Sequence, residues 1–245
     1  MTIALEAVEG MPEVRPGDDL GALVASSVPR LQQGDVLVVA QKVVSKAEGR
    51  LRDLATVAVS RRAYRLAASL PADPRMVQVV LDESVRIVRQ ERVLIVETRQ
   101  GFICANAGID RSNLGGDDVV SLLPLDCDRS ARQMQETIAA MAGTEVAVII
   151  SDTFGRPWRL GLINVALGVA GVPALIDHRG HNDDFGAPLR ATLVAIADEI
   201  AAAAGLVMGK TRRVPVVIVR GLDTSASRSG SGRDLIRPRE LDLFR

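Results

Sequence analysis

The part of the sequence that most limits its fold is the run 146–150, which is followed directly by Ser151, Asp152 and Thr153. The run is apolar and mostly β-branched, which is typical of a strand buried on both faces. The carboxylate and two hydroxyls at its end are hard oxygen ligands that suit Mg²⁺ or Mn²⁺ holding phosphates. Residues 155–157 contain a glycine and a proline and predict a turn. An ordinary strand end, with Asp152 capping the next segment, explains the pattern equally well.

Composition limits the class of protein. Of the 245 residues, 47% are apolar but only 2% are aromatic, so the core must consist of Ala, Val, Leu and Ile, which suits an α/β protein. The net charge of +0 argues against a nucleic-acid partner bound by phosphate neutralisation. We expect neither a signal peptide nor a membrane span, because residues 1–14 lack a basic region and no apolar run is long enough. Cys104 and Cys127 are too few for a disulfide framework. We therefore expect a cytoplasmic protein.

Apolar runs between turn residues predict the order of elements. Because 93–105 indicates a hairpin among helices, we expect mixed sheets in an α/β (α+β-like) fold. The chain has no GxGxxG and no GxxxxGK[ST], so a nucleotide would not be held by a Rossmann turn or a P-loop. Besides 146–150, strands are expected at 3–8, 36–40, 93–96, 101–105, 172–176 and 214–219. Helices are expected at 20–28, 61–70, 73–83, 128–141 and 188–207, the last being the longest.

Two polar segments could approach a phosphate. Segment 41–50 contains two lysines, a serine and a glycine, but exposed lysine is the common case and we interpret it as the solvated end of a strand. Segment 106–116 is polar and glycine-rich, with Asp110 and Asn113 as oxygen donors on a loop. A loop of this composition can lie against a nucleotide, but Asx-turns use the same residues. The sequence leaves both alternatives open for this loop.

Both histidines of the chain lie in the polar loop 177–186, with His178 and His181 three positions apart and carboxylates nearby. This spacing could indicate a metal site, but a stable transition-metal site usually has a third ligand in an ordered element. We therefore favour a solvated loop.

Several motifs together resemble one family. The stretches are GMPEVRPGDDL, GDVLVVAQKVVSKAEGR, NAGIDRSN, SDTFGRPWR, ADEIAAAAGLVMGK, PVVIVRGL and DLFR. In this order, and over nearly the whole chain, they resemble the coenzyme F420-0:L-glutamate ligases, or F420 gamma-glutamyl ligases. The resemblance implies a GTP-dependent ligase with two Mn²⁺ or Mg²⁺ sites, helped by K⁺. It would join L-glutamate to F420-0 through an acyl phosphate and then add a second, γ-linked glutamate.

The resemblance also implies an unusual ligase-family fold in an intertwined homodimer. Residues 1–245 would form a single ligase domain that could comprise two lobes. The nitroreductase-like domain of two-domain relatives is not expected here. By motif position, Asp110 would be a metal ligand, Asp152 a ligand of the first metal and Thr153 a ligand of the second. No catalytic base is implied. The residues implied to contact GTP are Met11, Pro12, Glu13, Val14, Gln41, Lys46, Asn113, Met208, Gly209 and Lys210.

One departure from the family pattern concerns the substrate. Leu162 stands where a glutamine would be expected, which removes a donor and an acceptor from the rim of the site. A related metal- and GTP-dependent ligase for a different carboxylate is therefore one alternative. A GTP-binding regulator without turnover is the other, although the combination of Asp110, Asp152 and Thr153 speaks against it. The sequence does not give the number of glutamates added, the metal used or the accepted form of F420.

Overall fold

A five-stranded mixed sheet forms the centre of the protein in a computed structural model, which describes residues 2–28, 30–111, 118–223 and 229–242. Its strand order is β1-β12-β2-β8-β9. β2 and β8 are parallel, whereas the other neighbours in this sheet are antiparallel. The expectation of mixed rather than purely parallel sheets is therefore confirmed. The bounds are β1 Ala4–Ala7, β2 Val36–Ala40, β8 Ala147–Arg156, β9 Arg159–Ala170 and β12 Val216–Arg220.

Helices cover both faces of this sheet. α1 (Leu20–Ser27), α2 (Gln41–Ala47) and α5 (Cys127–Ala142) contribute to the core on one face, together with Val148 and Ile150 of β8. The core on the other face is formed with α6 (Ile196–Met208) and includes Ile149. Because successive side chains of a strand point to opposite faces, the covered part of β8 must be apolar at every position, as residues 147–150 are. The prediction of a strand buried on both faces is confirmed.

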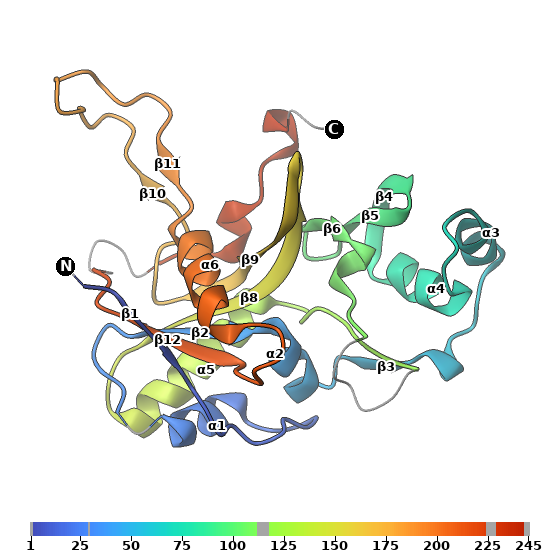
Figure 1. Cartoon of the computed structure of the whole chain (residues 1–245), viewed down its shortest axis with the longest axis horizontal. Coiled ribbons are helices and arrows are strands. Elements are labelled where there is room, and N and C mark those ends of the chain that lie inside the picture. The colour runs from blue at the N-terminus through green and yellow to red at the C-terminus, as the bar shows by residue number, and fades with distance from the viewer. Residues whose placement is uncertain (1, 29, 112–117, 224–228, 243–245) are drawn as a thin grey trace.

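A second, smaller core lies beside the sheet, at the right of Figure 1. Two helices, α3 (Arg61–Ser69) and α4 (Pro74–Asp82), pack on a three-stranded antiparallel sheet. The short strands β3 and β7 pair where the chain enters and leaves this region. The bounds are β3 Leu51–Asp53, β4 Ser84–Glu91, β5 Val93–Thr98, β6 Ile103–Ala105 and β7 Val119–Ser121, with single 3-10 turns at Leu54–Thr56, Asn106–Gly108, Gly232–Leu235 and Arg239–Leu241.

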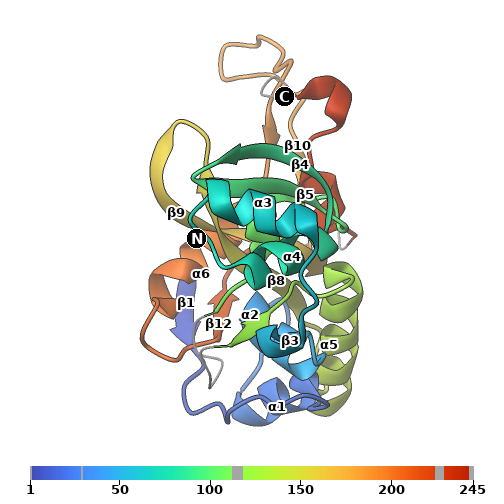
Figure 2. The ribbon, with the colours of Figure 1, turned by 90° about the vertical axis from the view of Figure 1, so that its right-hand side faces the viewer.

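A long hairpin projects from the body as an arm, drawn in orange in Figures 1 and 2. It contains β10 (Ile176–Asp177) and β11 (Leu193–Val194). The prediction of a helix at 188–207 is therefore wrong over its first eight positions, and α5 rather than α6 is the longest helix described. The backbone at 189–192 pairs with 178–180 across the hairpin, so those groups satisfy each other without a helix. Of the predicted strand 172–176, only Ile176 is in a strand, as the first residue of β10.

Other boundaries also differ from the predictions. Segment 41–50 begins with a helix, α2, and is not the end of a strand. β8 does not stop at Ser151 but continues to Arg156 because its ladder with β9 extends that far, so the turn falls at 157–158. Strand β4 is not predicted. Asp126, not Asp128, caps α5, and Gly143 ends it in the left-handed conformation as expected. Within the described ranges, no helix is long and apolar enough to cross a membrane.

Candidate active site

The parallel pairing of β2 with β8 ends at one edge of the main sheet, where β2 stops and β8 continues beyond it. Ala40 at the end of β2 lies opposite Ser151 of β8. Lys42 lies in the first turn of α2, directly after β2, and Asp152 directly follows Ser151. In open α/β sheets, ligands bind at this edge, where loops follow the strand ends. The pairing of β2 with β8 therefore brings together two charged residues that are far apart in the sequence.

Asp110 reaches the same edge through strand β7. Its backbone pairs with that of Ser121, with N–O distances of 3.2 and 2.9 Å. The next carbonyl, that of Leu122, accepts hydrogen bonds from Gln41 Nε2 at 3.2 Å and from Ser45 Oγ at 2.6 Å. Both of these donors are buried on α2. The end of β7 thus holds the Asp110 loop and α2 together, and Lys42 Nζ lies 2.7 Å from Asp110 Oδ2.

The charges of Lys42 and Asp110 both act on Asp152. Burial raises the pKa of Asp152 to about 6, and the charge of Asp110 raises it as well. A hydrogen bond from the Thr153 backbone and the charges of Lys210 and Lys42 act in the opposite direction. Like charges that act on each other in a partly dehydrated site favour a neutralising cation. We call Lys42, Asp110, Asp152, Thr153 and Lys210 the carboxylate cluster.

Thr153 belongs to this cluster on the other face of β8. Its hydroxyl donates to Asn164 Oδ1 at 3.2 Å and accepts a hydrogen bond from Lys210 Nζ. Asn164 in turn donates to Met208 Sδ at 3.6 Å, at the end of α6. The side chains of Asp152 and Thr153 leave the strand in opposite directions, as strand geometry requires. The two oxygen donors therefore flank β8 instead of sharing one face.

A second pair of charges lies farther along α2. Lys46 Nζ lies 2.5 Å from Glu13 Oε1. The hydrogen bond from Lys46 and its charge lower the pKa of Glu13, and the charge of Arg213 lowers it further. Met11 and Val14 pack into the core, whereas Glu13 is exposed. The segment before α1 and the turn after α6 therefore both approach α2.

The structure divides the residues that the sequence proposed. Asp110 acts on Asp152 by charge, whereas Thr153 binds Lys210 on the other face of β8. Glu13 and Lys46 form a separate pair. Three positions have structural roles. The amide of Gln41 donates to the Leu122 carbonyl, and Met208 is buried in the core between the main sheet and α6. Gly209 ends α6 with a positive φ of 57°. Pro12 is exposed beside Glu13. Asn113 lies outside the described residues.

Lys42 was missed by the sequence interpretation. The expectation that the lysines of 41–50 are solvated is wrong, because their side chains are only 21% (Lys42) and 12% (Lys46) exposed. The cause is tertiary: α2 packs between the main sheet and β7, so both lysines run along protein surface with their ammonium groups on carboxylates. A usable signal was the position of Lys42 just past a buried strand.

The donor set fits a hard divalent cation. Carboxylates and a hydroxyl are the oxygen ligands that Mg²⁺ and Mn²⁺ prefer. In the described part of the chain, no group of three or more His, Cys, Asp and Glu side chains could hold a metal ion. Mg²⁺ commonly uses one or two carboxylates and takes its other ligands from water and phosphates, so two carboxylates suffice. His178 and His181 lie in the arm with ring centroids 6.0 Å apart and belong to no such group.

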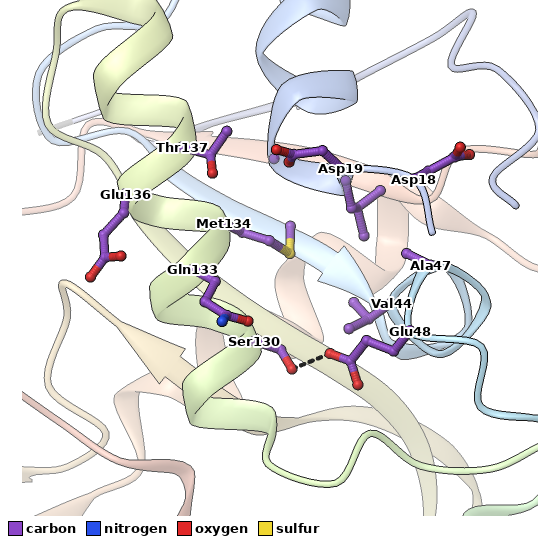
Figure 3. A pocket seen from close by; sticks show the side chains of 12 residues that line it. Asp18, Asp19, Val44, Ala47, Glu48, Ser130, Gln133, Met134, Glu136 and Thr137 are labelled. Atoms are coloured by element: carbon purple, nitrogen blue, oxygen red, sulfur yellow. Dashed lines mark hydrogen bonds between the residues drawn. The ribbon is translucent and has the colours of Figure 1, made fainter. Parts of the chain in front are cut away.

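A separate cavity of about 370 Å³ lies between α1, α2 and α5 (Figure 3). It faces the side of α2 that carries Val44 and Glu48, which helical spacing places roughly opposite Lys42. Burial raises the pKa of Glu48, and the hydrogen bond from Ser130 drawn in Figure 3 partly offsets this. The cavity shares no lining residue with the carboxylate cluster. Its size alone therefore does not mark it as the site of the chemistry.

Comparison with known proteins gives consistent matches. A family model described as F420-0:Gamma-glutamyl ligase matches residues 10–221. A protein of Methanothermobacter thermautotrophicus named coenzyme F420:L-glutamate ligase is 47% identical over 252 aligned positions, covering 100% of both chains. Proteins of the same name from Methanopyrus kandleri and Methanocaldococcus jannaschii are 45% and 41% identical. They cover 100% and 96% of this chain, and 98% and 94% of their own lengths are matched. The matched region includes every residue of the carboxylate cluster.

Proposed function

The chain belongs to the F420-0:gamma-glutamyl ligase family, whose members are ligases that form carbon–nitrogen bonds, and from this premise we propose that it joins L-glutamate to F420-0 in coenzyme F420 biosynthesis. We also propose that GTP is the co-substrate and that a second glutamate follows through a γ-linkage. The observation that carries the site assignment is the ion pair of Lys42 with Asp110, whose charges both act on Asp152 where the pairing of β2 with β8 ends.

The proposed reaction has two steps. A carboxylate is a poor acylating agent, so a carboxylate oxygen of F420-0 first attacks the γ-phosphorus of GTP, and GDP leaves. The amine of glutamate then attacks the carbonyl carbon of the acyl phosphate, phosphate leaves, and the amine proton passes to water. Phosphoryl transfer of this kind depends on alignment and charge neutralisation more than on covalent help from the protein.

The residues of the site match those needs. Lys42 and Lys210 would place positive charge beside the phosphates, and Lys46 would do so one helical turn away on α2. Asp110 and Asp152 would hold Mn²⁺ or Mg²⁺, with the hydroxyl of Thr153 at a second ion. The bound ions would neutralise phosphate charge and align the reacting groups. K⁺ is proposed as an additional activator, with no residue assigned to it.

We further propose a homodimer that uses the β10–β11 arm. Phe185 at the arm is 97% exposed, and Leu193 and Ile176 are 45% and 37% exposed. Apolar side chains on a projecting hairpin are suited to packing against a second copy of the chain. Light scattering after size-exclusion chromatography tests this: the wild type should run as a dimer, and Phe185→Ser should shift it toward monomer.

The test of function is incubation with F420-0, GTP, L-glutamate and Mn²⁺, followed by mass spectrometry. The expected product is heavier than F420-0 by one glutamate residue and later by two, with one GDP formed per residue added. GTP turnover that needs glutamate but not F420-0 would favour a ligase for a different carboxylate. Tight GTP binding without Mn²⁺ and without any turnover would favour a regulator.

A further inference from the structure

The Lys42 ammonium touches one carboxylate of the cluster and acts on the other. Its Nζ lies 2.7 Å from Asp110 Oδ2, and its charge lowers the pKa of Asp152. The Lys42 side chain is 21% exposed and that of Asp110 is 43% exposed, so the contact lies at the mouth of the site and not in bulk water. A positive charge therefore already occupies the Asp110 carboxylate, one of the two groups that would receive a cation.

The backbone that carries Lys42 is fixed, while its side chain is not. On either side of it along α2, Gln41 and Ser45 are buried and both donate to the carbonyl of Leu122. A lysine side chain has a flexible four-carbon stem, and its ammonium carries three rotatable N–H donors. The ammonium can consequently move from Asp110 to another anion without any shift of the helix.

A divalent cation that approaches the two carboxylates meets this ammonium at close range. Repulsion between positive charges a few ångströms apart is strong in a partly dehydrated site, and displacing the ammonium gives up its ion pair with Asp110. Nucleotide phosphates change the balance, because they offer Lys42 a new anionic partner and give the metal additional oxygen ligands.

We propose that Lys42 competes with the divalent metal for Asp110 and Asp152, and so makes metal loading depend on bound nucleotide. The inference rests on the proposed function of this site and adds a regulatory role for one residue. Because coupling between two ligands is reciprocal, Lys42 also makes nucleotide affinity depend on the metal. Metal without nucleotide is disfavoured, which keeps the site available for a metal–nucleotide complex.

Lys46 supplies a matched control. It is also a lysine of α2, one helical turn later, but its ion pair is with Glu13 and not with a carboxylate of the cluster. Removal of its charge should weaken nucleotide binding while leaving the binding of metal alone nearly unchanged. Lys42→Met and Lys46→Met therefore differ in the one contact that the proposal concerns.

The experiment measures Mn²⁺ binding by electron paramagnetic resonance, with and without a non-hydrolysable GTP analogue. In the wild type, the analogue should tighten Mn²⁺ binding by roughly tenfold or more. In Lys42→Met, Mn²⁺ alone should bind roughly tenfold tighter than in the wild type, and the effect of the analogue should shrink accordingly. Lys42→Arg, which keeps the charge, should retain weak binding of Mn²⁺ alone, and Lys46→Met should match the wild type without nucleotide.

Two results overturn the proposal in different ways. If Lys42→Met is folded by its thermal melt and binds Mn²⁺ alone no more tightly than the wild type, Lys42 does not compete with the metal, while the ligase proposal stands on its product assay. If neither the wild type nor any variant binds Mn²⁺ in the presence of the analogue, the metal site itself is wrong, and the competition fails with it.

Discussion

Two aspartates of this protein, Asp128 and Asp152, lie in contrasting surroundings. Asp128, in the first turn of α5, is buried, and the protein surrounds its carboxylate with donors. Its Oδ1 accepts hydrogen bonds from Val169 N at 2.9 Å and Gly232 N at 2.8 Å, and its Oδ2 accepts one from Ser231 Oγ at 2.5 Å. For Asp152, burial instead raises the pKa to about 6, and the negative charge of Asp110 raises it as well.

The contrast separates a structural carboxylate from one that we propose to be functional. The charge of Asp128 is met by fixed donors from β9 and from the 229–232 segment, so it ties three parts of the chain together. Burial and the charge of Asp110 disfavour the ionised form of Asp152. Its charge therefore lowers the stability of the folded protein unless a cation neutralises it. Groups with strongly perturbed pKa values and a like-charged neighbour are typical of functional sites.

The largest expected effect is a loss of activity when Asp152, or its neighbour in the carboxylate cluster, Asp110, is replaced. Asp152→Asn and Asp110→Asn should each lower product formation by at least ~100-fold, because a charge that stabilises phosphoryl transfer is lost. The melting temperature of Asp152→Asn should stay equal to that of the wild type or rise, since a buried charge and like-charge repulsion are removed. Asp110→Asn also loses the ion pair with Lys42, so its melting temperature should change little. Initial rates by mass spectrometry and thermal melts measure the two quantities.

Glu48→Gln is the control for these variants, because Glu48 is a carboxylate at the separate cavity and not in the cluster. It should keep turnover close to that of the wild type. Near-wild-type turnover in either aspartate variant would contradict the functional assignment.

The next largest effect is a loss of stability when Asp128 is replaced. Asp128→Ala leaves the N–H groups of Val169 and Gly232 buried without their acceptor, at a cost of about 2–4 kcal/mol in the free energy of unfolding. For a chain of this size the melting temperature should fall by roughly 4–16 °C. Turnover of the folded fraction at low temperature should persist. Urea unfolding and rate measurements at 15 °C or so test both statements.

Asp126→Ala gives a scale for that loss. Asp126 caps the same helix two positions earlier, and removal of an N-cap costs about 1 kcal/mol. If Asp128→Ala were no less stable than Asp126→Ala but had lost turnover, the structural and functional roles in the comparison would be reversed.

The smallest effect concerns Asp198, which combines features of both aspartates. It is half-buried, and burial raises its pKa, while the hydrogen bond from Ala166 N to its Oδ1, 2.8 Å long, partly offsets this. Since the pKa in the folded state exceeds 3.8, protonated Asp198 stabilises the fold at low pH, and this contribution is lost as pH rises through the folded pKa. Asp198→Asn keeps an acceptor and does not titrate.

At neutral pH the Asp198→Asn variant should therefore be more stable than the wild type, by at most about 1 kcal/mol. The difference should disappear toward pH 3.8. Urea unfolding of both proteins between pH 4 and 8 measures it, and a difference that grows as pH falls would show that the hydrogen bond outweighs burial.

Local patterns predicted those elements whose burial follows a regular period. β2 and residues 147–150 of β8 are apolar at each position because both faces are covered, and α5 ends at a glycine with positive φ. β4 was missed because it is largely exposed, carries charged residues and has two register shifts against β5. The false helix at 188–195 had an apolar period of 3.6, but those residues lie in the arm, where Leu193 is 45% exposed.

The candidate site shows the same division. Asp152 stood out as a polar residue at the end of a buried strand, and Asp110 as an oxygen donor on a polar loop. Their proximity was implied only by resemblance to a family. Lys42 was misjudged because exposure of a lysine depends on what packs around its helix, here β7 and the Leu122 carbonyl.

By itself, the sequence determined the central buried strand, most helix boundaries and the family, because these depend on residue type and on spacing along the chain. The tertiary structure alone decided which charges meet. The parallel pairing of β2 with β8, and the anchoring of α2 and the Asp110 loop to one short strand, bring Lys42, Asp110 and Asp152 together. Electrostatic interaction depends on distance in space and on burial, and neither is encoded in the spacing of residues along the chain.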